Sequence, residues 1–286
     1  MDITQQVLSE QDTCVLEAKP ESPTPDNPPW NGWIALLVWF ISVLLVVVVP
    51  SIVVLGYLAT RPELFSDPQV LVEFVKSDPV AIFLQVLALL PVHLATLALS
   101  WAVVTRFKAY PFRETLGWRS GGMRWWHYVL ILIGIVLIAG GVTNYFPEAD
   151  NEVLRIIRSS RAAVFVLAAL ATLTAPIVEE VVYRGILYSA FQRVFGVGIA
   201  VAVVTALFAL IHFPQYWPSF STLFLLTLLS LILTMVRVRT GNLLPCIILH
   251  TIFNGLQSIA LIAEPYVTTP TIDPGPINAV ILNLLK

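Results

Sequence analysis

The sequence predicts an all-α fold, a polytopic transmembrane helical bundle of about seven to eight membrane helices. Of its 286 residues, 57% are hydrophobic and only 12% are charged. Soluble domains carry about 25% charged residues, so the composition is typical of a multi-pass integral membrane protein. Several apolar runs also reach the length of about 20 residues that a helix needs to cross a bilayer. The net charge of −2 predicts no nucleic-acid partner.

The chain is expected to divide into a tail and a membrane-embedded helical domain. Residues 1–29 are acidic and proline-rich, which predicts a disordered tail. They lack the basic stub and short apolar core of a secretory signal. Residues 30–286 form the helical domain. The two cysteines lie far apart, and we expect Cys14 to be a free thiol in the tail and Cys246 to be a small buried side chain.

Trp30 and Trp33 mark the membrane interface at which the first span begins. The predicted spans are residues 34–59, 80–105, 128–146, 162–195, 199–213, 219–238 and 243–263. Residues 60–79 are expected to be a polar loop with at most a short amphipathic turn. Pro214 is expected to end the fifth helix. A last apolar segment, residues 277–285, is too short to span and is expected to lie on or dip into the bilayer.

The distribution of lysine and arginine predicts the orientation. The richest basic and aromatic loop is residues 106–127, which contains Arg106, Lys108, Arg113, Arg119 and Arg124. Placing this loop inside puts the N-terminus in the cytosol, by the rule that cytosolic loops carry more positive charge. The turns at residues 196–198 and 239–242 would then lie on the same side.

One run in the fourth helix places two carboxylates and an arginine among apolar residues. Charged side chains at membrane depth cost at least ~2.5–3.5 kcal/mol each on insertion scales, so they indicate function. Glu180 and Arg184 are four residues apart, which lets them pair on one helix face. Glu179 points about 100° away and has no partner in its own helix. It therefore has the character of a base that awaits a substrate.

Two further helices carry the remaining polar groups. His212 lies near the end of the fifth helix, and His250 and Asn254 share a face of the seventh. Counted from the turn that joins their helices, Glu179 and His212 lie roughly 25 and 21 Å deep, so they are nearly level. His250 lies only about 12 Å past its own turn, a difference that helix tilt can absorb. Together these groups could activate a water molecule and stabilise an oxyanion, as peptide hydrolysis requires.

The order of the three motifs resembles a known family. Glu-Glu-x-x-x-Arg, Phe-x-x-x-His and His-x-x-x-Asn, on successive membrane helices, are similar to those of the CPBP family of intramembrane proteases. That family contains the eukaryotic type II CAAX prenyl endopeptidases and bacterial proteins linked to bacteriocin self-immunity. The likeness covers about residues 100–260, within a protease-like core at about 100–263.

The resemblance implies an endopeptidase that acts on a membrane-anchored protein or lipidated peptide, which could carry a prenylated CAAX-type end. It implies that Glu179 is the catalytic carboxylate and that His212 aligns the water. It also implies that His250 and Asn254 stabilise the oxyanion, while Glu180 and Arg184 support the site. The favoured interpretation requires no cofactor. The alternative is a zinc site formed by Glu179, His212 and His250.

Two other functions use the same residues. A non-proteolytic membrane interaction or immunity protein could keep the fold without the reaction. A transporter could use the polar groups as an ion or proton path, but the chain shows no internal repeat of the kind that transporters contain.

Overall fold

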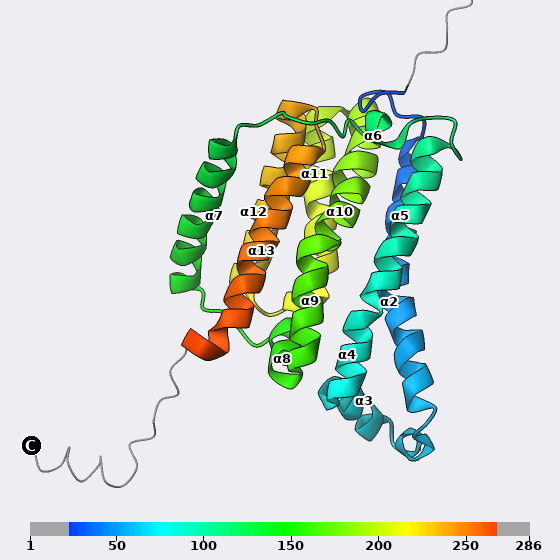
Figure 1. Ribbon diagram of the computed structural model, residues 1–286, viewed down its shortest axis with the longest axis vertical. Helices are drawn as coiled ribbons and strands as arrows, with labels where there is room; N and C mark the ends of the chain where they lie inside the picture. Colours follow the sequence, from blue (N-terminus) through cyan, green and yellow to red (C-terminus); the bar gives the residue numbers. More distant parts are fainter. Residues whose placement is uncertain (1–22, 268–286) are drawn as a thin grey trace, which may run out of the picture.

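The computed structural model describes residues 23–267, which form helices and contain no strand. Figure 1 shows long helices that run side by side along one axis, with short helices at the lower end. The elements that make up the long helical stretches are α2 (Gly32–Leu58), α4 (Pro79–Leu87), α5 (Leu89–Thr105), α7 (Trp125–Tyr145), α9 (Arg161–Leu173), α10 (Ala175–Glu180), η2 (Val181–Leu187), α11 (Tyr188–Tyr216), α12 (Phe220–Thr240) and α13 (Leu244–Val267). The separate short helices are η1 (Pro62–Ser66), α3 (Pro68–Ser77), α6 (Phe112–Thr115) and α8 (Glu152–Ser159).

Six helical stretches within residues 23–267 are long and apolar enough to cross a membrane. One of them, Arg161–Tyr216, has 56 residues. A straight helix of that length would measure about 84 Å, far more than the roughly 30 Å of a hydrocarbon core. The backbone leaves the helical region at Gly196 (φ 80°, ψ 168°), and the chain folds back there. The result is seven crossings, in agreement with the predicted bundle; residues 277–285 lie outside the described part.

The helix that carries the paired glutamates is bent and rewound. It stops at Thr174, whose hydroxyl donates to the carbonyl of Leu170 (3.0 Å), and restarts with Pro176 in the first turn of α10. From Val181 to Leu187 it becomes a π-helix, η2. Such widened turns occur mostly at functional sites. The helix nevertheless continues past Arg184, which is the condition on which the depth comparison of Glu179 and His212 depended.

Two predicted features need correction. The segment 60–79 is largely helical, because Asp67 and Asp78 each cap a helix that begins with proline, α3 and α4. Pro214 does not end the fifth helix, which runs on to Tyr216. A proline in the last turn removes a single backbone hydrogen bond, which one more short turn can tolerate.

One end of the bundle is closed by the chain just before α2. Gln192 donates to the carbonyl of Pro25 (3.3 Å) and to Asp26 (2.8 Å), and Arg106 donates to the carbonyl of Pro29. At the same end, the amide of Leu243 donates to the carbonyl of Gly117 (3.1 Å). Residues 23–30, the 106–124 loop and the turns at Gly196 and Gly241 therefore share one side, as predicted. The rest of the predicted tail, residues 1–22, lies outside the described residues.

The largest core cluster surrounds η2. Val181, Ile186 and Leu187 of η2 are fully buried and pack with side chains of α2, α11 and α13. By contrast, α2 and α7 expose rows of large apolar side chains, among them Leu37, Phe40, Leu130 and Leu137. Exposed apolar surfaces of this extent are typical of helices that face lipid. The bundle therefore buries its central π-helix and presents its outer helices to the bilayer.

Candidate active site

An ion pair lies at the centre of the bundle, where the sequence predicted it. Nη1 of Arg184 donates to Oε1 of Glu180 at 2.9 Å, and both side chains are completely buried. An uncompensated charge in such a place costs several kcal/mol, so each group depends on the other. The predicted supporting role of Glu180 and Arg184 has this pair as its structural basis.

Helix α12 supplies partners for the arginine that the sequence analysis missed. Nε of Arg184 donates to the hydroxyl of Thr234 (3.2 Å), and Nη2 donates to the hydroxyl and the carbonyl of Ser230 (2.8 Å each). Ser230 and Thr234 lie four residues apart on one face of an apolar helix, and both are buried. That spacing is the signal that could have identified them, because polar residues inside a membrane helix need partners.

His250 of α13 lies between the two glutamates. Its Nδ1 is 2.8 Å from Oε1 of Glu180, and its Nε2 is 3.7 Å from Oε2 of Glu179. Oε1 of Glu180 therefore accepts from both Arg184 and His250, whereas Oε2 has no hydrogen-bond partner in the described part of the chain. His250, which the count from its turn placed at a shallower depth than Glu179, therefore lies beside both carboxylates.

Glu179 is the more accessible of the two glutamates. Its side chain is 24% exposed, against 0% for Glu180. Three side chains from neighbouring elements are near enough to interact electrostatically with its carboxylate: His93 of α5, Tyr183 of η2 and Tyr216 of α11. Nδ1 of His93 hydrogen bonds with the hydroxyl of Thr174 (2.7 Å), which joins α5 to the residue just before α10. Glu179 is thus an accessible carboxylate in a polar, aromatic enclosure.

His212 is oriented by its own helix. Its Nδ1 lies 2.7 Å from the carbonyl oxygen of Phe208, one turn earlier. A carbonyl can only accept, so Nδ1 carries the proton and Nε2 of the neutral ring has a free lone pair. No hydrogen bond or ion pair joins His212 to Glu179 within the described residues. The ring of Phe208 packs near both histidines, with its centroid 4.6 Å from that of His212 and 6.2 Å from that of His250.

Asn254 ties the seventh helix to the fourth. Its Nδ2 donates to the carbonyl of Ala171 in α9 at 2.9 Å. One turn further on, Ser258 and Thr172 hydrogen bond through their hydroxyls (3.0 Å). One of the two amide hydrogens of Asn254 is therefore engaged with the backbone, and the second remains for a bound group.

Two tryptophans, Trp39 of α2 and Trp30 just before that helix, hold the π-helix in place. The sequence predicted that Trp30 marks the membrane interface and gave no role to Trp39. Trp30 donates from Nε1 to the carbonyl of Ile186, and Trp39 donates from Nε1 to the hydroxyl of Tyr183, each at 3.0 Å. Because Tyr183 accepts from Trp39, its own O–H hydrogen is free to donate. Tyr183 lies one turn after Glu179, so its side chain is on the same face of the helix as the exposed carboxylate.

The alternative zinc site has no preformed cluster. Between residues 23 and 267 no three His, Cys, Asp or Glu side chains are grouped closely enough to hold a metal ion. Glu179 and His250 face each other at 3.7 Å, but no hydrogen bond or ion pair joins His212 to either of them in the described residues. The described arrangement does not fit a three-ligand zinc centre, and we assign no step to a metal.

The cluster has one negative charge more than its arginine can balance. Two carboxylates and one guanidinium leave a single excess charge, and a buried net charge is costly. Nε2 of His250 lies 3.7 Å from Oε2 of Glu179, where a protonated imidazole would balance that charge. A carboxylate and an imidazole that face each other are the equipment of general acid–base chemistry.

One comparison with known proteins gives a match to a protein family. Residues 161–256 match the family model for Type II CAAX prenyl endopeptidase Rce1-like proteins. No curated protein and no solved structure matches the chain. The matched segment contains all six predicted site residues, from Glu179 to Asn254. This match agrees with the resemblance that the three motifs predicted.

Proposed function

We propose that this protein is an intramembrane endopeptidase that hydrolyses a peptide bond in a membrane-anchored, lipidated substrate of the CAAX type. The observation that carries the proposal is the position of Glu179, partly exposed, 3.7 Å from Nε2 of His250 and next to the closed Glu180–Arg184 pair. A buried pair of that kind fixes the helix, while the free carboxylate can act on water. The family match supports the same reaction class.

In the proposed reaction, Glu179 takes a proton from a water molecule, and the hydroxide oxygen forms a bond to the substrate carbonyl carbon. The free Nε2 of His212 accepts a hydrogen bond from that water and aligns it. The oxyanion forms near His250, whose Nε2–H donates when the ring carries both protons, and near the second amide hydrogen of Asn254. When the carbon–nitrogen bond breaks, the proton held by Glu179 moves to the leaving amine.

The enclosure favours an extended substrate segment. A peptide bond inside a helix is hidden by its own backbone hydrogen bonds, so a segment near the membrane surface is the better target. The basic loop 106–127 lies at the end of the bundle that closes over the π-helix (Figure 1). A lipid anchor would hold such a segment at the bilayer while its chain enters the site.

The test is mass spectrometry of the products that the purified protein releases from a library of lipidated peptides in nanodiscs. We expect cleavage at one bond near the lipidated residue, and equal cleavage in a chelator. Cleavage that a chelator abolishes and zinc restores would instead select the metal-dependent mechanism. Ion or proton flux in vesicles without any peptide product would refute the proteolytic function in favour of transport.

A further inference from the structure

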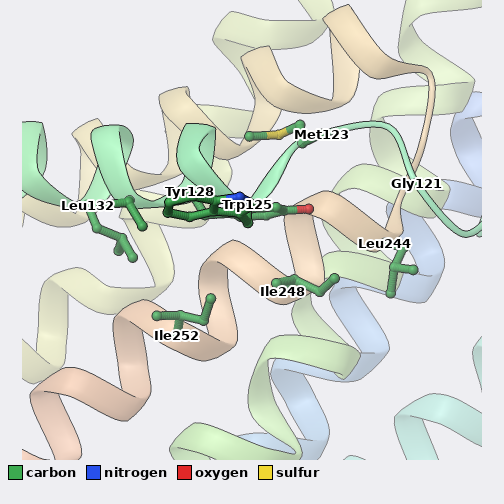
Figure 2. A pocket seen from close by; sticks show the side chains of 9 residues that line it. Gly121, Met123, Trp125, Tyr128, Leu132, Leu244, Ile248 and Ile252 are labelled. Atoms are coloured by element: carbon green, nitrogen blue, oxygen red, sulfur yellow. The ribbon is translucent and has the colours of Figure 1, made fainter.

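A cavity lies on the outer side of the bundle, away from the glutamates. It has a volume of about 530 Å³ and opens between α7 and α13 below the 121–125 turn. Figure 2 shows Trp125 and Tyr128 on one side of it and Leu244, Ile248 and Ile252 on the other. Apart from the Tyr128 hydroxyl and the Trp125 indole N–H, its side chains are apolar. Nothing in the proposed reaction uses this groove, which we call the α7–α13 groove.

Helix α13 separates this groove from the candidate active site. Ile248 and Ile252 line the groove. Each is two residues from His250, a rotation of about 200°, so they point to the opposite side of the helix. An apolar chain lying in the groove therefore does not reach Glu179. The occupant is not an anchor placed next to the bond being cut.

The mouth of the groove is held in shape by Asn242. Its Oδ1 accepts from the amide of Arg119 (3.1 Å), and its Nδ2 donates to the carbonyls of Arg119 (2.8 Å) and Gly121 (3.1 Å). Gly122 then passes Asn242 so closely that an added Cβ would lie 3.1 Å from Nδ2. The loop at the entrance is thus fixed to the start of α13 by hydrogen bonds on both sides.

Positive charge lies next to that mouth. Arg124 is exposed in the chain between Met123 and Trp125, which both line the groove, whereas Arg119 lines a different hollow together with Glu114. Arg124 forms no salt bridge with a carboxylate in residues 23–267. The surrounding loop, residues 106–127, contains five Lys or Arg and one acidic residue, Glu114. An anionic group at the mouth would meet the guanidinium of Arg124, the kind of side chain that suits phosphate best.

The size of the groove limits the occupant to a flexible chain. A volume of about 530 Å³ lies within the roughly 300–1,000 Å³ of small-molecule sites. Three turns of a helix about 10 Å wide and 16 Å long occupy on the order of 1,000 Å³, so a partner helix does not fit. A single acyl chain does. The combination of an apolar slot and a cationic rim matches an anionic phospholipid, because basic pockets between membrane helices bind such headgroups.

We propose that the α7–α13 groove is a binding site for one acyl chain of an anionic phospholipid, whose phosphate lies at Arg124 beside the groove mouth. The lipid fills the space between α7 and the body of the bundle, since α7 packs mainly on α12 there. It also fixes the loop whose other end reaches Leu116 and Gly117 beside η2. This site is independent of the proposed peptidase reaction.

The test uses the full chain reconstituted in nanodiscs that contain phosphatidylcholine and phosphatidylglycerol. After mild detergent extraction, native mass spectrometry counts the lipids that each molecule retains. We expect one retained phosphatidylglycerol in preference to phosphatidylcholine. The substitution Arg124→Gln should lower that preference roughly fivefold, from about 1 kcal/mol per removed charge near the membrane surface. Lys108→Gln, in the same loop but away from the lining residues, is the matched control and should change it little.

A second pair of variants tests the slot itself. Ile248→Trp or Leu132→Phe should fill the groove and remove the retained lipid, whereas Leu137→Trp on the exposed face of α7 should not. Thermal melting of each variant identifies any that fails to fold, and the two filling variants come from different helices. Equal retention of both lipids by the unchanged protein, or full retention in the filled variants, would overturn the proposal. Displacement of the lipid by a farnesylated cysteine ester would assign the groove to the substrate's anchor instead.

Discussion

The Nδ1 atom of His250 lies 2.8 Å from Oε1 of Glu180, so the seventh helix is fastened directly to the buried ion pair of the fourth. The same ring turns its other nitrogen toward Glu179, at 3.7 Å. One imidazole therefore connects a fully buried carboxylate to a partly exposed one. This connection distinguishes the surroundings of two adjacent glutamates that look alike in the sequence.

Removing one member of the ion pair should be far more damaging than removing both. Glu180→Gln leaves the guanidinium of Arg184 buried without its counter-charge, and we expect a loss of about 3–5 kcal/mol of stability. The double variant Glu180→Gln, Arg184→Met should recover part of that loss. Thermal melting in detergent measures both. Asp150→Asn, which breaks the exposed pair with Arg158, should cost less than about 1 kcal/mol; equal effects at the two sites would contradict this description.

Two substitutions of His250 should separate its structural contact from its chemical one. Asn places an amide nitrogen near the position of Nδ1, so His250→Asn should keep the hydrogen bond to Glu180 and most of the stability. It has no atom facing Glu179, and cleavage should fall by on the order of 10²-fold or more. His250→Phe should lose cleavage and also about 1–3 kcal/mol of stability, because it leaves a buried acceptor unpaired. Normal cleavage by the Asn variant would exclude a chemical role.

The hydrogen bond between Trp39 and Tyr183 should couple the first span to the π-helix. A double-mutant cycle with Trp39→Phe and Tyr183→Phe isolates that contact from the packing of the rings. We expect a coupling energy of about 0.5–1.5 kcal/mol in melting experiments. Strictly additive losses would show that the 3.0 Å contact contributes nothing to stability.

Two glycines with positive φ should respond differently to alanine. Gly196 has φ +80° and ψ 168° with open space around it, so Gly196→Ala meets only the backbone cost of about 1–3 kcal/mol. Gly117 has φ +66°, and its added Cβ would lie 2.7 Å from Pro25 Cγ and 2.9 Å from the carbonyl oxygen of Gly241. Gly117→Ala should therefore destabilise considerably more. Equal melting temperatures for the two variants would show that residues 23–30 are not held against this loop.

Local spacing predicted the parts of the site that lie within one helix. The Glu180–Arg184 pair follows directly from an interval of four residues, and the long apolar runs gave the spans and the common side of the loops. Contacts between helices were less accessible. The depth count placed His250 too shallow, because it assumes parallel helices and turns at equal height. It also did not show that Phe208 would pack near both histidines.

Other features depended on tertiary contacts that no short pattern contains. The proline-rich character of residues 23–29 indicated disorder, yet these residues acquire partners from Gln192, Arg193 and Arg106. The π-helix has no sequence signature of its own. Ser230 and Thr234, in contrast, could have been identified, because their spacing places two hydroxyls on one face of a buried helix.

The most direct test of the central claim is cleavage of a membrane-anchored lipidated peptide by Glu179→Gln, measured by product mass spectrometry beside thermal melting of the same sample. Glu179 is partly exposed and stands outside the ion pair, so the variant should melt like the unchanged protein and release no product. Undiminished cleavage by a correctly folded Glu179→Gln protein would contradict the account.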